Sequence, residues 1–104
     1  MKLGNARAVI TGGASGLGLA VARRIVEAGG RATLLDIQKD AGDAAAAALG
    51  DAGAFTRCDV TDEAAVDAAV RAAAEQMGGL TLAVACAGVG TPGKLLGRAF
   101  GRHF

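Results

Sequence analysis

A short apolar run that stops at a cluster of glycines, and continues as an amphipathic segment, constrains this chain more than any other feature. The run is Ala8–Ile10, glycines follow at positions 12, 13, 16 and 18, and apolar residues then recur at helical spacing from Leu17 to Ala28. This pattern predicts a strand, a tight turn and a helix. The first N–H groups of such a helix point outward unpaired, and glycines let a phosphate approach them closely. A glycine-rich turn without a ligand is the alternative.

The composition bounds the class of protein. With 104 residues, of which 52% are hydrophobic, the chain is long enough for one packed domain. Its formal net charge of +1 argues against nucleic acid or another polyanion as a partner. No apolar run approaches the roughly 20 residues of a membrane span, and Met1–Asn5 leads directly into the first predicted strand. We therefore expect no membrane partner, no signal peptide and a cytoplasmic location.

The two cysteines, Cys58 and Cys86, are not arranged as a C-x-x-C motif. No second pair is present to complete a zinc site. We expect both thiols to be reduced and buried, and no metal to be bound. The single histidine, His103, is expected at a solvated surface position.

An acidic residue ends the second predicted strand. The strand covers Arg31–Asp36, after a helix stop at Gly29 and Gly30, and Asp36 lies 24 residues after Gly12. At about this spacing, a carboxylate at a strand end meets the ribose hydroxyls of a dinucleotide whose pyrophosphate lies on the glycine turn. Because a carboxylate accepts hydrogen bonds from the ribose diol and repels a 2′-phosphate, Asp36 predicts NAD rather than NADP. A surface aspartate that begins a loop is the alternative.

Further elements follow in alternation. Gly50 closes a predicted helix, and Thr61 is the expected N-cap of another, in whose first turn the helix dipole favours Asp62 and Glu63. The apolar stripe of that second helix has the helical period: Val66, Ala69, Val70, Ala73 and Met77. The predicted ranges are a helix at 39–49, a strand at 54–58, a helix from Thr61 to about 77 and a strand at 80–87.

This order of strands and helices indicates parallel strands joined by right-handed crossovers. Residues 80–87 are apolar at nearly every position, which is typical of a strand inside a parallel sheet that helices cover on both faces. We therefore predict an α/β fold, a Rossmann-like doubly wound parallel sheet of about four strands and three helices. Ligands bind at the carboxyl ends of such strands, where the glycine turn, Asp36, Asp59 and Cys86–Gly88 all fall.

These residues together resemble the short-chain dehydrogenases/reductases. Thr11–Gly18 is similar to the family's T-G-x-x-x-G-x-G cofactor loop, Asp36 to its NAD-selecting acid, and Asp59–Val60 to the pair beside the adenine ring. Ala85–Gly88 is similar to its N-N-A-G segment, although alanine stands here in place of an asparagine that ties neighbouring strands together. The chain looks most like the branch of the family that acts on 3-hydroxyacyl-CoA and hydroxysteroids.

The resemblance implies where NAD would bind, and it divides the chain. It extends from residue 7 to about residue 90, so we expect an NAD-binding half-domain at 1–90 and a basic tail at 91–104. The pyrophosphate would contact Gly12, Ser15, Gly16, Leu17 and Gly18. The adenosine ribose would contact Asp36, the adenine Asp59 and Val60, and the inner ribose Cys86, Ala87 and Gly88.

The family's reaction is the oxidation of a secondary alcohol by hydride transfer to NAD, and it needs a serine and a Tyr-x-x-x-Lys pair for proton exchange. This sequence contains no tyrosine, and Ser15, its only serine, lies in the expected phosphate loop. We assign no catalytic residue and expect this polypeptide to be inactive alone. The alternative is a non-catalytic nucleotide-binding or protein-interaction module. The substrate cannot be read from these residues.

The last segment allows two interpretations. Basic residues recur every four positions at 94, 98 and 102, while apolar residues at 96, 100 and 104 fall on another face, as in a basic amphipathic helix. Gly97 and Gly101 each disfavour a helix by about 1 kcal/mol, which favours an irregular tail instead. In the family the fourth strand is interior, so a chain that stops after it exposes an apolar edge. We therefore expect self-association through residues 80–87.

Overall fold

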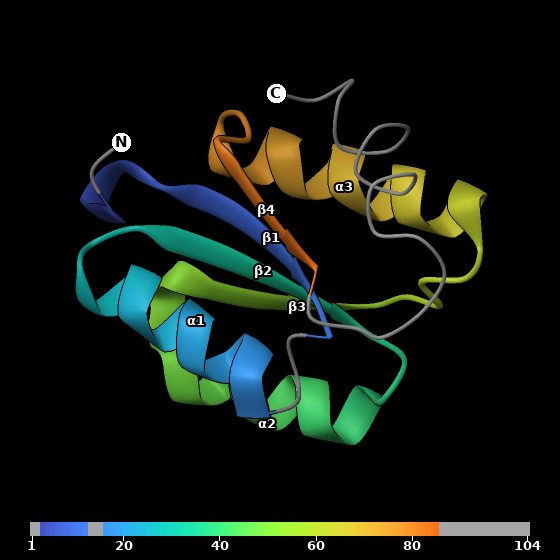
Figure 1. The fold of residues 1–104 in the computed structure, drawn as a ribbon, viewed down its shortest axis with the longest axis horizontal. Coiled ribbons are helices and arrows are strands. Elements are labelled where there is room, and N and C mark those ends of the chain that lie inside the picture. Colours follow the sequence, from blue (N-terminus) through green and yellow to red (C-terminus); the bar gives the residue numbers. More distant parts are fainter. Residues whose placement is uncertain (1–2, 13–15, 86–104) are drawn as a thin grey trace.

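The computed structural model describes residues 3–12 and 16–85, which form one parallel sheet with helices on both faces (Figure 1). The alternation of strands and helices expected from the sequence is confirmed. The strands are β1 (Arg7–Thr11), β2 (Arg31–Asp36), β3 (Gly53–Arg57) and β4 (Leu82–Ala85). The helices are α1 (Gly16–Glu27), α2 (Lys39–Leu49) and α3 (Glu63–Met77), with short 3-10 turns at Leu3–Asn5 and Gly50–Ala52.

The order of the strands in the sheet is β3-β2-β1-β4, and every neighbouring pair is parallel. The chain therefore starts near the middle of the sheet, builds outward through β2 and β3, and crosses back over β1 to add β4. This reversal places the carboxyl ends of β1 and β4 on either side of the point at which the winding direction changes, with the end of β2 next to that of β1. Ligands of doubly wound sheets bind at that point. The predicted α/β doubly wound fold is confirmed.

Two layers of apolar side chains hold the helices to the sheet, and alternate strand residues supply them. Ile10 and Leu34 point to the face that α1 and α2 cover, where they meet Ile25. Val9 and Leu35 point to the other face and pack under α3. The largest side chains of both layers are fully buried, and each such Val, Leu or Ile contributes about 1.5–3 kcal/mol by burial.

The apolar stripe expected on α3 faces the sheet. Its members are all buried: Val66, Ala69, Val70, Ala73 and Met77. On the opposite face, α2 approaches β3 closely because it carries Gly42 over the ring of Phe55. A methyl group on Gly42 would overlap that ring. A helix-breaking residue inside α2 is thus explained by packing, although glycine costs a helix about 1 kcal/mol relative to alanine.

Several element boundaries differ from those expected from the sequence. The third strand covers Gly53–Arg57 rather than 54–58, because its register with β2 pairs the first residue with Ala32 and the last with Asp36. The fourth strand begins at Leu82 rather than at residue 80. Residues 86 and 87, also expected in that strand, lie outside the described residues.

The N-cap of α3 is Asp62, not Thr61 as the sequence suggested. One carboxylate oxygen of Asp62, Oδ1, accepts hydrogen bonds from the N–H groups of Ala64 at 3.1 Å and Ala65 at 3.2 Å. The Thr61 hydroxyl is used elsewhere, since it donates to Asp59 Oδ1 at 2.6 Å. Asp62, expected in the first turn of the helix, is the cap instead, because the side chain of Thr61 bonds within the preceding turn.

Candidate functional site

Three of the predicted site positions meet at the carboxyl edge of the sheet. Gly12 directly follows β1, Asp36 is the last residue of β2, and Asp59 follows β3 after one intervening residue. The strands are parallel and adjacent, so their ends lie side by side. Backbone hydrogen bonds join them: the N–H of Gly12 donates to Leu35 O at 2.8 Å, and the N–H of Cys58 donates to Asp36 O at 2.9 Å.

The backbone at Gly12 requires glycine. Its φ is +70°, in the left-handed region that a residue with a Cβ enters only at a cost of about 1–2 kcal/mol. This conformation turns the chain away from the sheet immediately after β1. The N–H of Gly12 remains bonded to Leu35, so the turn is anchored on the residue before Asp36.

The start of α1 leaves room above its backbone. A Cβ placed on Gly16, the first helical residue, would meet nothing within 4 Å. Leu17 is 69% exposed, and Gly18 is buried against the sheet. A ligand group can therefore come close to the main chain here, at the helix end that carries partial positive charge. Ser15, predicted to share this role, lies outside the described residues.

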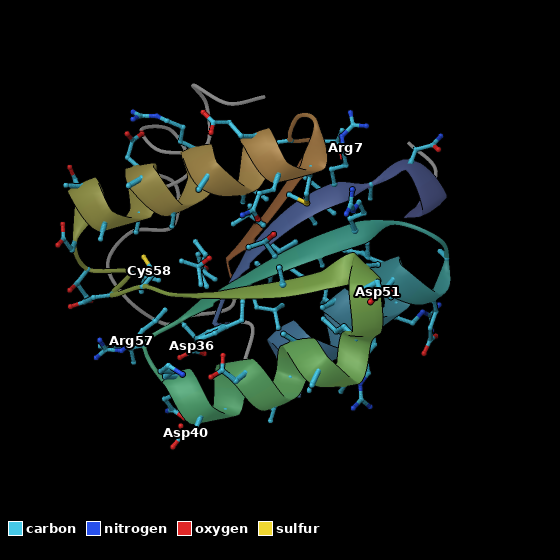
Figure 2. All side chains as sticks on the ribbon, turned by 180° about the vertical axis from the view of Figure 1, so that it is seen from behind. Arg7, Asp36, Asp40, Asp51, Arg57 and Cys58 are labelled. Atoms are coloured by element: carbon cyan, nitrogen blue, oxygen red, sulfur yellow. The ribbon has the colours of Figure 1, made fainter. Side chains whose placement is uncertain are left out.

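Asp36 is half-buried and points to the same face of the sheet as α1. Alternation along β2 places Ala32, Leu34 and Asp36 on the face covered by α1 and α2, and Figure 2 shows the labelled side chain between the sheet and α2. Its Oδ1 accepts a hydrogen bond from the N–H of Gln38 at 3.2 Å. The carboxylate and the start of α1 thus share one side of the sheet.

Asp59 and Val60 also lie at this edge, but their side chains are partly engaged by the protein. Asp59 is exposed, and its Oδ1 accepts from both the N–H (2.9 Å) and the hydroxyl (2.6 Å) of Thr61. The hydroxyl bond, followed by the N–H bond, lowers the pKa of Asp59 below its ordinary value of 3.8. Val60 packs on the apolar cluster beneath α3.

Arg57 is a residue of this edge that the sequence analysis missed. It is the register partner of Asp36 on β3, and its Nε donates to the backbone oxygen of Ile37 at 3.2 Å. An exposed cation therefore stands next to the predicted ribose-binding acid (Figure 2). The sequence could not show that these residues are neighbours, because Arg57 and Ile37 are 20 residues apart in the chain and only the pairing of β2 with β3 brings them together.

Cys58 is buried on the α3 face, as predicted, and is not in a disulfide. Burial raises the pKa of the Cys58 thiol, with smaller contributions from the negative charges of Asp59 and Asp62. A thiol in this environment is protonated and unreactive at neutral pH. Among residues 3–12 and 16–85, no group of histidine, cysteine and carboxylate side chains could hold a metal ion.

The remaining predicted site residues, Cys86, Ala87 and Gly88, lie outside the described residues, as does the tail at 91–104. Within the part of the chain that the structure describes, no helix has the length and apolar character needed to cross a membrane.

Comparison with known proteins extends these observations. A family model described as short chain dehydrogenase matches residues 6–98. The 3-hydroxyacyl-CoA dehydrogenase type-2 of Bos taurus is 48% identical over 87 residues, which are 84% of this chain and 33% of that protein. The enzyme of the same name from Homo sapiens is 47% identical over 87 residues, with the same shares covered. An uncharacterised oxidoreductase of Mycobacterium bovis is 49% identical over 88 residues, which are 82% of this chain and 36% of that protein.

A solved structure is similar as well. It is that of a 3-ketoacyl-(acyl-carrier-protein) reductase from Brucella melitensis complexed with NADH. The two folds agree with a TM-score of 0.70 at 36% sequence identity, over 73% of this chain and 31% of the other. The chain therefore spans about a third of the length of the proteins that it matches.

Proposed function

The chain belongs to the short-chain dehydrogenase family, and from that membership we propose that residues 1–90 form the part of such an enzyme that binds NAD. The whole protein would oxidise a secondary alcohol, of the 3-hydroxyacyl-CoA or hydroxysteroid class, by hydride transfer to this cofactor. Its relatives support the proposal, since two of them are named 3-hydroxyacyl-CoA dehydrogenase type-2. A neighbouring structure of the same fold was solved with NADH.

The observation that carries this proposal is the position of Asp36 relative to Gly12 and the start of α1. All three lie at the carboxyl edge and on one side of the sheet, and the Gly12–Leu35 hydrogen bond of 2.8 Å fixes the spacing between turn and acid. A pyrophosphate bound at the turn and a ribose bound at the acid would belong to one and the same dinucleotide. The open space at Gly16 is consistent with a phosphate approaching the main chain.

Asp36 supports NAD rather than NADP as the cofactor. Its carboxylate can accept hydrogen bonds from both hydroxyls of the adenosine ribose. A 2′-phosphate would put like charges within a few ångströms of each other, and this repulsion is stronger at a half-buried position than in bulk water. Arg57 lies close enough to the turn after Asp36 to offset part of this repulsion, so we expect NADP to bind more weakly than NAD rather than not at all.

The other contacts remain proposals that follow from the family. Asp59 and Val60 would lie along the adenine, whose ring can pack on the backbone of their turn while Thr61 holds the Asp59 carboxylate. The remaining contacts would come from Ser15, Leu17, Gly18 and from Cys86, Ala87 and Gly88.

Binding and turnover are separate properties of this polypeptide. A family member needs a tyrosine to exchange the proton of its substrate, and the 104 residues contain none. We therefore expect them to bind NAD without oxidising an alcohol. Absorbance at the NADH wavelength with a 3-hydroxyacyl thioester tests the second part, and sustained NADH formation would refute it.

The test of cofactor binding is calorimetric titration with NAD and NADP. Asp36→Ala removes the ribose acceptors, so we expect NAD affinity to fall at least about tenfold, the loss of one or two hydrogen bonds to a charged group. Asp51→Ala is the matched control, because Asp51 is exposed near the start of β3 at the other edge of the sheet. Equal affinity of all three proteins for NAD, or no binding of either nucleotide, would reject the proposal.

One observation favours a second role, that of an interaction module. β4 is an outer strand of the described sheet and pairs with β1 along one side. A further strand from a second copy could pair along its other side. Light scattering over a range of concentrations measures this: association that grows with concentration supports the role, and a monodisperse monomer at high concentration excludes it.

A further inference from the structure

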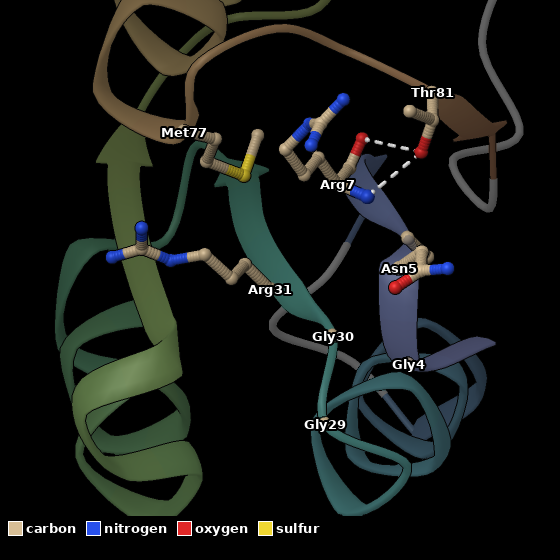
Figure 3. Close-up of a pocket in the computed structure, with 9 residues that line it drawn as sticks. Gly4, Asn5, Arg7, Gly29, Gly30, Arg31, Met77 and Thr81 are labelled. Atoms are coloured by element: carbon tan, nitrogen blue, oxygen red, sulfur yellow. Dashed lines mark hydrogen bonds between the residues drawn. The ribbon is translucent and has the colours of Figure 1, made fainter. Parts of the chain in front are cut away.

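A cavity opens at the amino edge of the sheet, at the end of the strands opposite to the proposed NAD site. Its volume is about 550 Å³, and the strand starts at Arg7 and Arg31, the glycines at 29 and 30, Met77 and Thr81 are part of its lining (Figure 3). Two of the lining residues are cationic, and none is acidic or aromatic. The cavity thus combines a volume typical of small-molecule sites with a formal charge of one sign.

The two arginines are brought together by the register of the sheet. Arg7 and Arg31 are paired across β1 and β2, and each is the first residue of its strand. Their side chains leave the same face as Val9 and Leu35, the face that α3 covers. In Figure 3 the two guanidinium groups diverge from neighbouring strands, with Met77 between them. An anion entering the cavity meets two positive charges on one face.

Arg7 is held firmly at its backbone. Its N–H donates to Thr81 Oγ1 at 2.8 Å, and its carbonyl oxygen accepts from the N–H of Thr81 at 2.9 Å. The guanidinium lies over Gly79, where a Cβ would be 3.6 Å from Nη2 and 3.8 Å from Nε. Nε is buried and has no hydrogen-bond partner among the residues that the structure describes. Buried donors rarely lack an acceptor, so this N–H marks a position where an acceptor is missing.

The helix ends at this edge oppose an anion, but not strongly enough to exclude it. The carboxyl ends of α1, α2 and α3 all lie at this edge, and each carries a partial charge of about −0.5. The N–H groups of Gly29 and Gly30 cap carbonyls of α1 at 3.0 and 2.9 Å, and that of Gly79 caps a carbonyl of α3 at 2.8 Å. Two full positive charges outweigh these partly neutralised ends.

We propose that this cavity, the Arg7–Arg31 pocket, binds a small phosphate dianion, either free or as the headgroup of a compact phosphate ester. The charge of the ligand matches that of the two guanidinium groups. Arg7, which lines the cavity, carries a planar guanidinium whose N–H groups have the geometry that pairs with two phosphate oxygens. Arg31 is exposed and can swing over the ligand once it is bound. The pocket is separate from the NAD site, so the proposal does not depend on the proposed function.

The direct test is a two-dimensional ¹H–¹⁵N spectrum of the full chain titrated with inorganic phosphate, with chloride at matched ionic strength as the reference. We expect the side-chain Nε–H signal of Arg7 and the backbone signals of Arg31 and Thr81 to move with phosphate and not with chloride. Movement confined to Gly12 and Gly16 would mean that phosphate binds only at the glycine turn, and would overturn the proposal.

Two variants measure how much each arginine contributes to phosphate binding. Arg7→Gln should weaken phosphate binding at least about tenfold, since a charge-assisted bidentate contact is lost, and Arg31→Gln should weaken it less. Arg57→Gln removes the same charge at the opposite edge and should leave the signals of Arg31 and Thr81 as responsive as before. If Arg7→Gln does not fold, phosphate binding by Arg31→Gln and the titration of the unaltered chain still test the proposed pocket. Unchanged binding in Arg31→Gln together with a silent Arg7 Nε–H rejects the site.

The source of the dianion is distinguished by comparing inorganic phosphate with glycerol phosphate. Tighter binding of the ester identifies a phosphate ester as the occupant, and tighter binding of the inorganic ion identifies free phosphate. Acetate is the third arm, because it offers a planar carboxylate with one negative charge. Acetate that binds as tightly as both phosphates, with the same Arg7 dependence, would refute a phosphate-specific pocket.

Discussion

At the carboxyl edge of the sheet β2 ends in Asp36 and Asp59 follows β3, although Arg57 also lies there, whereas at the amino edge β1 and β2 begin with arginine. Asp36 and Asp59 lie at the first edge, where helices start, and Arg7 and Arg31 lie at the second, where helices end. Each set of charges therefore has the sign that the nearby helix dipoles favour. Charge alone does not distinguish a side chain that stabilises the fold from one that binds a ligand.

Hydrogen bonding and burial together separate them. Asp59 and Asp62 use the same oxygen, Oδ1, to accept two hydrogen bonds each from their own turns. They serve local structure, whatever else they contact. Arg7 has a buried Nε–H for which the described residues provide no acceptor. Asp36 also accepts a hydrogen bond from its own turn, but it is half-buried where Asp59 and Asp62 are exposed, and it lies beside Gly12, whose φ is +70°. These two positions, one at each edge, are where we expect ligands.

The largest effect expected is that of Gly12→Ala. At a φ of +70° the new Cβ costs about 1–2 kcal/mol of stability, and we expect the methyl group to hold a phosphate away from the turn. Calorimetry should show NAD affinity reduced at least about tenfold. Gly78→Ala is the matched control, because Gly78 has a φ of +77° and a ψ of 26°, in the left-handed region, with open space around its Cβ position. It should lose similar stability and keep NAD binding; equal loss of binding in both variants would contradict a site at the carboxyl edge.

A smaller effect is expected from Asp62→Ala, which tests whether an acid at the carboxyl edge can be purely structural. Loss of the two N-cap hydrogen bonds to Ala64 and Ala65 should lower the free energy of unfolding by about 1 kcal/mol in a urea titration. NAD affinity should not change. Asp62→Asn keeps a capping oxygen and should restore most of the stability. A loss of NAD affinity without a loss of stability would place Asp62 in the binding site instead.

The smallest effect expected is a pH dependence at Asp59. The hydrogen bonds from Thr61 lower its pKa in the folded state below 3.8. Since the unfolded state takes up the proton first as pH falls, the stability from this carboxylate is complete well above pH 3.8 and is lost below that value. Urea unfolding at neutral pH and at about pH 3 should therefore differ less in Asp59→Asn than in the unaltered chain. An equal pH dependence in both proteins would show that the Asp59 carboxylate does not contribute to the pH dependence of stability.

The bounds of β2 and α2, two elements that lie next to glycines, were predicted as observed. β2 begins directly after Gly30, and α2 ends directly before Gly50, as expected. The stripe on α3 was readable because its period matches a helix packed on one face. The expectations for Gly12 and Asp36 placed them correctly at strand ends. Their roles in binding stay predictions.

The N-cap of α3 and the limits of β3 were predicted wrongly, because more than one local arrangement was compatible with the sequence at these places. Thr61 was expected as the N-cap of α3, but its hydroxyl donates to Asp59 and the carboxylate of Asp62 caps the helix instead. The limits of β3 depended on pairing with β2, since neither end of that strand has a distinctive residue. In both cases the deciding energy comes from a partner in space rather than from the residue itself.

The sequence by itself determined the order of elements, their parallel connection and the edge at which the glycine turn and Asp36 must lie, because period and turn residues act over short distances along the chain. Only the tertiary structure decided which side chains became neighbours across strands. Arg57 lies beside Asp36, Arg7 beside Arg31, and Arg7 is bound to Thr81 from 74 residues away. Such pairings follow from register, which the packing of both faces of the sheet sets together.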